Sequence, residues 1–231
     1  MMIRNFLKHL KSIAVPDAAR FRTFPLGLCR GYRFLINFRH DTLLYLGLYE
    51  VEIRFFFETF ARQSRCCFDI GANSGYYSLA FARCSPTGSV YALEGDPKAC
   101  DLLRATIDQN PRIKSRVQVL ENWIEKTTDL DQRQVSLDYL IFERGLPPPD
   151  LLKVDIEGME YNFLRGAEEV VKRYLPRLII ETHDAEIERH CVFFLKERGY
   201  RVLIINQRTW LPEHRPLAHN RWICAEPVLR P

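Results

Sequence analysis

Short apolar runs alternate with longer amphipathic segments through most of this chain. The short runs predict β-strands, and the longer segments, whose apolar residues recur at helical spacing, predict helices. The expected strands are residues 66–70, 89–93, 117–120, 151–156, 177–181, 201–205 and 221–225, and the expected helices are residues 74–84, 97–110, 159–171 and 185–198. Strands that alternate with helices pack as a parallel sheet covered on both faces. The pattern therefore predicts an α/β fold with a doubly wound, mostly parallel, seven-stranded, Rossmann-like sheet, in which the last two strands form an antiparallel pair.

The first sixty residues precede this alternation. They predict an N-terminal extension, residues 1–60, ahead of a sheet domain, residues 61–231. Apolar and charged residues recur at helical spacing in residues 1–14 and 43–61, so we expect a helical extension packed on the core. Residues 1–14 also fit a helix that contacts a membrane surface. The aromatic and basic residues 21–39 fit either core packing or part of an acceptor pocket.

The strongest motif is FDIGANSGYY, residues 68–77, which predicts a buried strand, a glycine-rich turn and the start of a helix. Asp69 lies at the end of the strand, and Gly71 and Gly75 flank the turn. The next strand ends in Glu94, nineteen residues after Gly75. In doubly wound sheets such a turn lets the backbone approach a nucleoside, and the later carboxylate hydrogen-bonds the ribose hydroxyls. The motif therefore predicts a nucleoside site at the carboxyl ends of these strands.

Two features of the turn indicate which nucleoside it holds. A dinucleotide fold uses the pattern GxGxxG, because a pyrophosphate lies on bare backbone N–H groups. This turn lacks the third glycine and places the anionic Asp69 beside the ligand. A carboxylate repels a pyrophosphate and attracts a cation such as the sulfonium of S-adenosylmethionine. S-adenosylmethionine is therefore the expected cofactor, and an NAD-linked oxidoreductase or a degenerate nucleoside-binding module without catalysis is the alternative.

A second motif, LLKVDIEGME at residues 151–160, places acidic residues at the end of the fourth expected strand. Strand periodicity places Lys153 and Asp155 on one face. A lysine in a strand covered on both sides needs a partner, and Asp69 or Glu181 is expected to provide it. The motif fits a carboxylate cluster aimed at a reacting centre and, equally, a structural ion pair beside a helix N-terminus. The first motif favours the catalytic interpretation.

Together these motifs resemble the FkbM family of S-adenosylmethionine-dependent methyltransferases. The matching segments are FDIGANSGYYSL (68–79), VYALEGDP (90–97), VSLDYL (135–140), LLKVDIEGMEYNFLRGA (151–167) and LIIETH (178–183), with Tyr49 and Glu50 upstream. Ser74 and Gly95 depart mildly from the family pattern. The resemblance covers about residues 40–205. It implies a class I methyltransferase that methylates a hydroxyl oxygen of a sugar, a glycolipid or a secondary metabolite such as a macrolide.

Carried over by position, the resemblance also implies which residues bind the cofactor. The methionine end is expected at the glycine turn, the ribose at Glu94 and the adenine at the end of the third strand. The expected cofactor-binding residues are Asp69, Gly71, Asn73, Gly75, Tyr76, Glu94, Asn122, Trp123 and Asp155. The product of the reaction would be S-adenosylhomocysteine.

Methyl transfer to an alcohol requires in-line alignment and loss of the hydroxyl proton, so a base or a metal should assist it. The candidate catalytic residues near the expected mouth of the site are Asp155, Glu157, Glu181 and His183. His183 has the best intrinsic pKa for a base. Asp155 and Glu181 offer the alternative of a Mg²⁺ site, because hard cations take oxygen ligands. A carboxylate or histidine base without a metal is favoured.

Composition narrows the expected partners. The net charge of +4 over 231 residues is too small and too dispersed for a nucleic-acid-binding surface. Seven cysteines without a CxxC pair fit buried thiols in a reducing cytoplasm. No apolar run is long enough to span a bilayer, and no signal peptide is evident. We therefore expect a cytoplasmic enzyme that acts on a small-molecule or glycan acceptor and not on nucleic acid.

Overall fold

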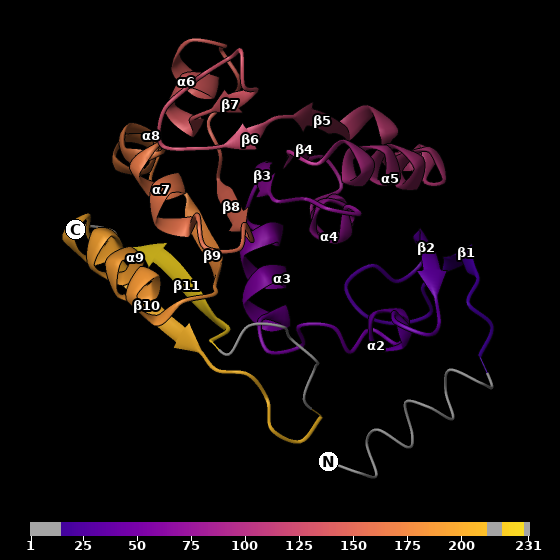
Figure 1. Ribbon diagram of the computed structural model, residues 1–231. Coiled ribbons are helices and arrows are strands. Elements are labelled where there is room, and N and C mark those ends of the chain that lie inside the picture. Colours follow the sequence, from indigo (N-terminus) through magenta and orange to yellow (C-terminus); the bar gives the residue numbers. More distant parts are fainter. Residues whose placement is uncertain (1–14, 212–218, 229–231) are drawn as a thin grey trace.

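The computed structural model of the protein describes residues 15–211 and 219–228 (Figure 1). The helix expected in residues 1–14, with its alternative role at a membrane surface, lies outside the described residues. A central sheet runs through the molecule, helices pack on both of its faces, and the described part of the N-terminal extension packs beside one face.

The central sheet has seven strands in the order β10-β11-β9-β8-β3-β4-β5. These strands are β3 (Cys66–Ile70), β4 (Ser89–Glu94), β5 (Val117–Glu121), β8 (Leu151–Val154), β9 (Arg177–Thr182), β10 (Tyr200–Ile205) and β11 (Arg221–Pro227). Neighbours from β9 to β5 are parallel, and β11 lies antiparallel between β9 and β10. The predicted doubly wound, mostly parallel, seven-stranded sheet is confirmed, although β8 ends two residues earlier than expected.

Two sets of helices cover the two faces of this sheet. One face carries α3 (Arg54–Arg62), α4 (Tyr76–Cys84) and α5 (Pro97–Asp108), and the other carries α6 (Leu137–Phe142), α7 (Glu160–Arg165), α8 (Glu168–Tyr174) and α9 (Ala185–Glu197). Alternate residues of each strand pack into the hydrophobic cores on opposite faces of the sheet. In β9, Ile179 packs toward the first set, and Leu178 and Ile180 pack toward the second. Because both faces are covered, the central strands are apolar almost throughout.

The described part of the N-terminal extension is not wholly helical. A hairpin of β1 (Ala19–Thr23) and β2 (Arg33–Asn37) precedes α2 (Thr42–Tyr45) and α3. Phe34 and Ile36 of β2 are buried in the same core as α4, whereas Arg33 before them and Leu35 between them are exposed. The single helix expected over residues 43–61 is two helices separated by turns. The hairpin and α3 thus share one continuous core with the sheet.

The helix expected after the fourth sheet strand is also divided. The chain bends at Gly166, between α7 and α8, where a Cβ would lie 2.3 Å from the backbone oxygen of Glu125. Glu125 directly follows β6 (Trp123–Ile124), which pairs in parallel with β7 (Gln134–Val135). A short 3-10 helix (Pro111–Arg116) leads into β5. The excursion between β5 and α6 is therefore packed against α7 and α8.

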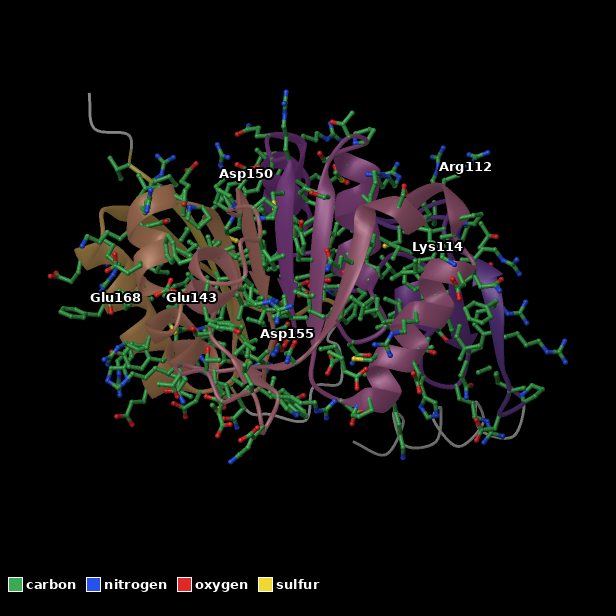
Figure 2. The ribbon with its side chains drawn as sticks, turned by 90° about the horizontal axis from the view of Figure 1, so that it is seen from above. Arg112, Lys114, Glu143, Asp150, Asp155 and Glu168 are labelled. Carbon is green, nitrogen blue, oxygen red and sulfur yellow. The ribbon has the colours of Figure 1, made fainter. Side chains whose placement is uncertain are left out.

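The strand order reverses between β3 and β8, because the chain passes from β3 to β4 on one side and later forms β8 on the other. Ligands of such sheets bind in the crevice at the carboxyl ends of the strands where this reversal occurs. Gly71 and Asp155 are the first residues beyond β3 and β8. Seen from above, Asp155 lies near the centre of the molecule, whereas Asp150, just before β8, lies toward its edge (Figure 2).

Candidate active site

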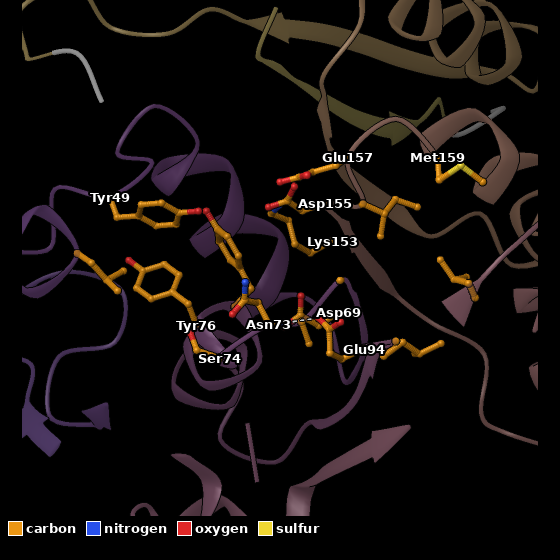
Figure 3. A pocket seen from close by; sticks show the side chains of 18 of the residues that line it. Tyr49, Asp69, Asn73, Ser74, Tyr76, Glu94, Lys153, Asp155, Glu157 and Met159 are labelled. Atoms are coloured by element: carbon orange, nitrogen blue, oxygen red, sulfur yellow. Dashed lines mark hydrogen bonds between the residues drawn. The ribbon is translucent and has the colours of Figure 1, made fainter. Parts of the chain in front are cut away.

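A cavity of about 1160 Å³ opens at this crevice (Figure 3). Its walls come from the turns after β3, β4 and β8, from the segment after β5 and from residues 39–44 and Tyr49 of the extension. Of the expected site residues, those that line the cavity are Asp69, Gly71, Asn73, Tyr76, Glu94, Asn122, Trp123, Asp155 and Glu157. Of the other three, Gly75 and His183 contact the lining residues Ala72 and Asp155. Glu181 lies one step further from the cavity, against His183.

The floor of the cavity is a close contact between the turn after β3 and the end of β8. Gly71 has a φ of +78°, and a Cβ there would lie 1.9 Å from the backbone oxygen of Asp155. The Asp155 N–H donates to the Ile70 carbonyl at 2.9 Å, and the Gly71 N–H donates to the Leu93 carbonyl of β4 at 3.0 Å. Only glycine fits this junction, which explains the first glycine of the motif.

Glu94, at the end of β4, is fixed by two backbone donors. One carboxylate oxygen accepts the Asn73 N–H at 2.8 Å, the dashed contact in Figure 3, and the other accepts the Asp96 N–H at 2.9 Å. Each oxygen of a carboxylate can accept a further hydrogen bond. Because the side chain also lines the cavity, Glu94 is oriented in advance to accept hydroxyl donors from a ligand.

Trp123 forms part of the wall close to Glu94. Its indole packs so closely on Gly95 that a Cβ at Gly95 would lie 2.0 Å from Trp123 Cδ2. Trp123 nevertheless remains 48% exposed, and Asn122 lines the cavity beside it. An aromatic face that is supported on one side and accessible on the other suits a stacked base. Gly95, a departure from the family pattern, is thus the residue that makes room for the indole.

Asp69 lies in the floor of the cavity, near the end of β3. It is only 2% exposed and accepts a hydrogen bond from Ser78 Oγ of α4 at 2.6 Å. Burial raises the pKa of Asp69 to about 6, although the Ser78 hydrogen bond and the Lys153 charge oppose this shift. The carboxyl group is therefore mostly ionised at pH 7 and gives the floor of the cavity a negative charge.

Gly75 contributes to packing and not to the lining of the cavity. It is the N-cap residue of α4, with a φ of +89°, and a Cβ there would lie 2.5 Å from a side-chain carbon of Leu103 in α5. The second glycine of the motif thus permits the close approach of two helices under the turn.

His183 lies at the centre of a buried charge cluster. Its Nδ1 lies 2.6 Å from Glu160 Oε1, and its Nε2 lies 3.6 Å from both Asp155 Oδ1 and Glu181 Oε1. Burial lowers the pKa of the imidazole, but the hydrogen bonds to Glu160 and Glu181 and the charge of Asp155 outweigh burial and raise the pKa to about 10. The imidazole is therefore protonated at neutral pH. Since an imidazolium has no free lone pair, this geometry argues against the base role expected for His183.

Glu160 is a further member of this cluster, although its place in the sequence indicates only an acid near a helix N-terminus. It is fully buried, and besides contacting His183 it accepts the Gly158 N–H at 3.0 Å. An acid in the first turn of a helix is explained by the helix dipole alone. The sequence therefore does not indicate that Glu160 contacts His183, 23 residues away.

The candidate acids differ in their access to the cavity. Glu181 is 1% exposed and accepts hydrogen bonds from Asn220 Nδ2 and, at 3.2 Å, from Trp222 Nε1. Asp155 and Glu157 both line the cavity, and Figure 3 shows the two carboxylates side by side. Of the four candidate catalytic residues, these two can meet a substrate directly.

A shared metal site is a second way to use the same groups. Asp155, Glu181 and His183 each offer one ligand atom, and these atoms lie within 4.8 Å of one another. The protonated ring of His183 already brings positive charge between the two carboxylates. A cation would have to displace the His183 proton, so Mg²⁺ at this position stays the less favoured prediction.

Lys153 does not form the ion pair that its buried position predicts. Its side chain is fully buried, and Nζ makes no hydrogen bond to the residues that the structure describes. Nζ instead lies 4.6 Å from the centre of the Tyr77 ring. The expected partners Asp69 and Glu181 raise the pKa of Lys153 through their charges but make no hydrogen bond to Nζ. Figure 3 shows Lys153 beside Asp155 at the cavity.

The extension supplies the outer wall of the cavity through residues 39–44 and Tyr49. A buried ion pair holds this segment in place. Arg208, in the loop after β10, contacts Glu52 Oε2 at 2.8 Å and donates to the Leu48 carbonyl at 2.7 Å. Segments near both ends of the chain therefore meet beside the candidate site.

Several solved structures with a similar fold are methyltransferases. A methyltransferase FkbM from Methylobacillus flagellatus KT has a TM-score of 0.56 and 19% identity, over 70% of this chain and 43% of that chain. A SAM-dependent O-methyltransferase from Thermotoga maritima gives a TM-score of 0.51 and 19% identity over 75% and 65% of the two chains. An O-methyltransferase from Bacillus cereus in complex with SAH gives a TM-score of 0.52 and 18% identity over 74% and 79%. The protein thus has the class I methyltransferase fold, and it spans less than half the length of the first of these proteins.

The amino-acid sequence shows a more specific likeness than the fold does. Residues 99–202 match the Methyltransferase FkbM domain. The predicted resemblance to the FkbM family is confirmed over these residues. No curated protein matches the chain. None of the described helices combines the length and the apolar character that crossing a bilayer requires.

Proposed function

We propose that the protein is an S-adenosylmethionine-dependent O-methyltransferase that modifies a hydroxyl group of a sugar, a glycolipid or a secondary metabolite. The observation that carries the proposal is the carboxylate of Glu94, which lines the cavity at the end of β4 and is fixed by two backbone amides. The FkbM domain match supports methyl transfer, and the likeness to O-methyltransferases is consistent with a hydroxyl acceptor.

The residues around the cavity fit this cofactor. Trp123, supported by Gly95, offers a face for adenine, and Glu94 offers acceptors for ribose hydroxyls. Asp69 and Asp155 make the floor anionic, which favours a ligand that carries a sulfonium and an ammonium group. When bound, S-adenosylmethionine supplies an electrophilic methyl group. The cavity of about 1160 Å³ is large enough for such a nucleoside and an acceptor together.

Asp155 is the proposed general base. Its side chain is 30% exposed, lines the cavity and lies beside the imidazolium of His183. It would accept the proton of the acceptor hydroxyl as the oxygen becomes the nucleophile. Glu160, Glu181 and His183 would act as positioning residues, because the imidazolium fixes the direction of the Asp155 carboxylate and is itself held by the two buried glutamates.

Calorimetric titration of the purified protein with S-adenosylmethionine and, separately, with NAD tests the cofactor. We expect micromolar binding of S-adenosylmethionine and no binding of NAD, because Asp69 gives the floor a charge that a pyrophosphate does not tolerate. Binding of NAD would overturn the proposal in favour of an oxidoreductase. Folded protein that binds neither compound, with or without Mg²⁺, would indicate a module that has lost its activity.

Substitutions of Glu94 and Asp155 are expected to separate cofactor binding from catalysis. Glu94→Gln should weaken S-adenosylmethionine binding about 10- to 100-fold, because it removes charge-assisted hydrogen bonds to the ribose. Asp155→Asn should lower kcat by about 100-fold or more, a larger effect than the loss of cofactor affinity that follows from removing one charge of the floor. Affinity is measured by calorimetry, and kcat is measured with the first acceptor found by screening hydroxylated sugars and lipids. Equal losses of affinity and kcat in both variants would contradict this division of roles.

A further inference from the structure

Lys153 is a buried cation at the cavity that none of the described residues hydrogen-bonds. Its side chain is fully buried and lines the cavity, and Nζ has no hydrogen-bond partner within residues 15–211 and 219–228. An ammonium group carries three donors, and leaving them unpaired in a buried position is costly. A group of this kind beside a cavity is explained by a ligand oxygen that accepts its hydrogen bonds.

Nearby acids keep Lys153 charged without bonding to it. Burial favours the neutral amine, but Asp155, Glu50, Glu181 and Asp69 together raise the pKa of Lys153 above its ordinary value. The face of the Tyr77 ring, 4.6 Å from Nζ, adds a cation–π contact. The group is therefore an ammonium at neutral pH, with donors directed to no described acceptor.

The position of Lys153 connects it with the glycine turn. Lys153 of β8 pairs in register with Asp69 of β3, two residues before Gly71. The floor of the cavity thus combines one cation with two carboxylates, those of Asp69 and Asp155. Charges of both signs at one place are complementary to a zwitterion, whose ammonium is attracted by the acids and whose carboxylate is attracted by the lysine.

The other basic residues of the lining belong to the extension and not to the floor. Arg39 Nε donates to the Val15 carbonyl at 2.8 Å, and Arg39 Nη1 lies 3.4 Å from an Asp17 carboxylate oxygen. His40 lies next to it in the chain. Lys153 is therefore the cation placed to receive an anionic group at the glycine turn.

We propose that Lys153 binds the carboxylate of the amino-acid end of the cofactor, a role that rests on the proposed function. The ammonium of that amino-acid end would then lie toward Asp69 and Asp155. This arrangement would hold the amino-acid end of the cofactor in one orientation on the floor of the cavity. It also gives the cavity a means to distinguish a nucleoside that carries a carboxylate from one that carries only an amine.

The test compares two ligands by calorimetry, S-adenosylhomocysteine and its decarboxylated analogue, which retains the amine. The wild-type protein should bind S-adenosylhomocysteine about 10- to 100-fold more tightly, the range expected for a charge-assisted hydrogen bond. Lys153→Met should reduce this ratio to less than about threefold, because a side chain of similar shape without charge cannot recognise the carboxylate. The affinity for the analogue should stay the same or rise, since the variant no longer repels its ammonium.

Arg39→Gln is the matched control, because Arg39 also lines the cavity, and it should keep the wild-type ratio. Equal affinities of the wild-type protein for both ligands would overturn the role of Lys153 and leave the proposed function standing. An equal loss for both ligands in Lys153→Met would overturn it too. Wild-type protein that binds neither ligand would refute the proposed function itself.

A crystal structure of the wild-type protein with S-adenosylhomocysteine decides the question even where Lys153→Met does not fold. The expected result is a carboxylate oxygen within about 3.2 Å of Nζ. A carboxylate bound by any other residue, with Nζ beyond hydrogen-bond distance, would refute the assignment.

Discussion

Replacing Gly71 with alanine is expected to destabilise the protein by about 3–5 kcal/mol, the sum of a strained backbone conformation and an overpacked contact. The added Cβ would lie 1.9 Å from the Asp155 carbonyl oxygen, and both groups belong to backbone that cannot rotate away. Relief requires β3 and β8 to separate at their carboxyl ends. Because that junction is the floor of the cavity, we also expect S-adenosylmethionine binding to be lost. Urea unfolding and calorimetry measure the two effects.

Gly199→Ala provides the control for backbone conformation. Gly199 follows α9 and has the same φ, +78°, but a Cβ there would meet nothing within 4 Å. This variant should lose only about 1 kcal/mol, the cost of a left-handed alanine, and should keep full cofactor binding. Similar losses of stability in the two variants would show that the contact between Gly71 and Asp155 is not as tight as described.

The second large effect is a loss of stability at alkaline pH that depends on His183. The pKa of His183 is about 10 in the folded protein and about 6.5 in an unfolded chain. A group whose pKa is raised by folding contributes its full stabilisation below the unfolded pKa. This contribution falls as the pH rises through the folded pKa. The imidazolium should therefore stabilise the fold by about 3 kcal/mol at pH 6, the order expected for a buried ion pair, and progressively less up to pH 10.

Subtracting the behaviour of His183→Gln isolates this contribution, because cysteine, tyrosine and lysine groups that titrate in the same range are common to both proteins. The difference in free energy of unfolding between wild type and variant should shrink steadily from pH 6.5 to pH 10. A direct NMR titration of the His183 ring should give a midpoint far above 6.5. A constant difference, or a ring that titrates near 6.5, would mean that the imidazole is neutral in the folded protein.

The sheet was predictable because its signals are local. Each central strand is a short apolar run between helices. Gly71 and the acids Asp69 and Glu94 indicate the glycine turn. The same locality explains why the nine cavity-lining residues that were expected do meet. All of them lie at or just beyond the carboxyl ends of parallel strands, or in the turn and helix start that follow β3. Adjacent parallel strands bring such positions together whatever the loops do.

Interactions between distant segments were not predictable in the same way. Glu160 hydrogen-bonds to His183. An acid at the start of α7 is already explained by the helix dipole, so its position does not indicate this contact. Lys153 was expected to bond Asp69 or Glu181, because sequence gives the face of a residue and not the distance between side-chain ends. The hairpin has no clear sequence signal, because Leu35 between Phe34 and Ile36 is apolar although exposed, so β2 shows no alternation of polar and apolar residues.

The ion pair between Glu52 and Arg208 has a consequence for how the protein is made. Its two residues are 156 positions apart, so a ribosome releases the acid long before its basic partner. Trp222 and Cys224 complete the same core as Phe34 and Phe57. The parts of this core that precede β11 in the chain therefore keep an incomplete apolar surface until β11 has been synthesised. Contacts of such long sequence separation slow folding and expose intermediates to aggregation, so this protein should depend on chaperones while it is being synthesised.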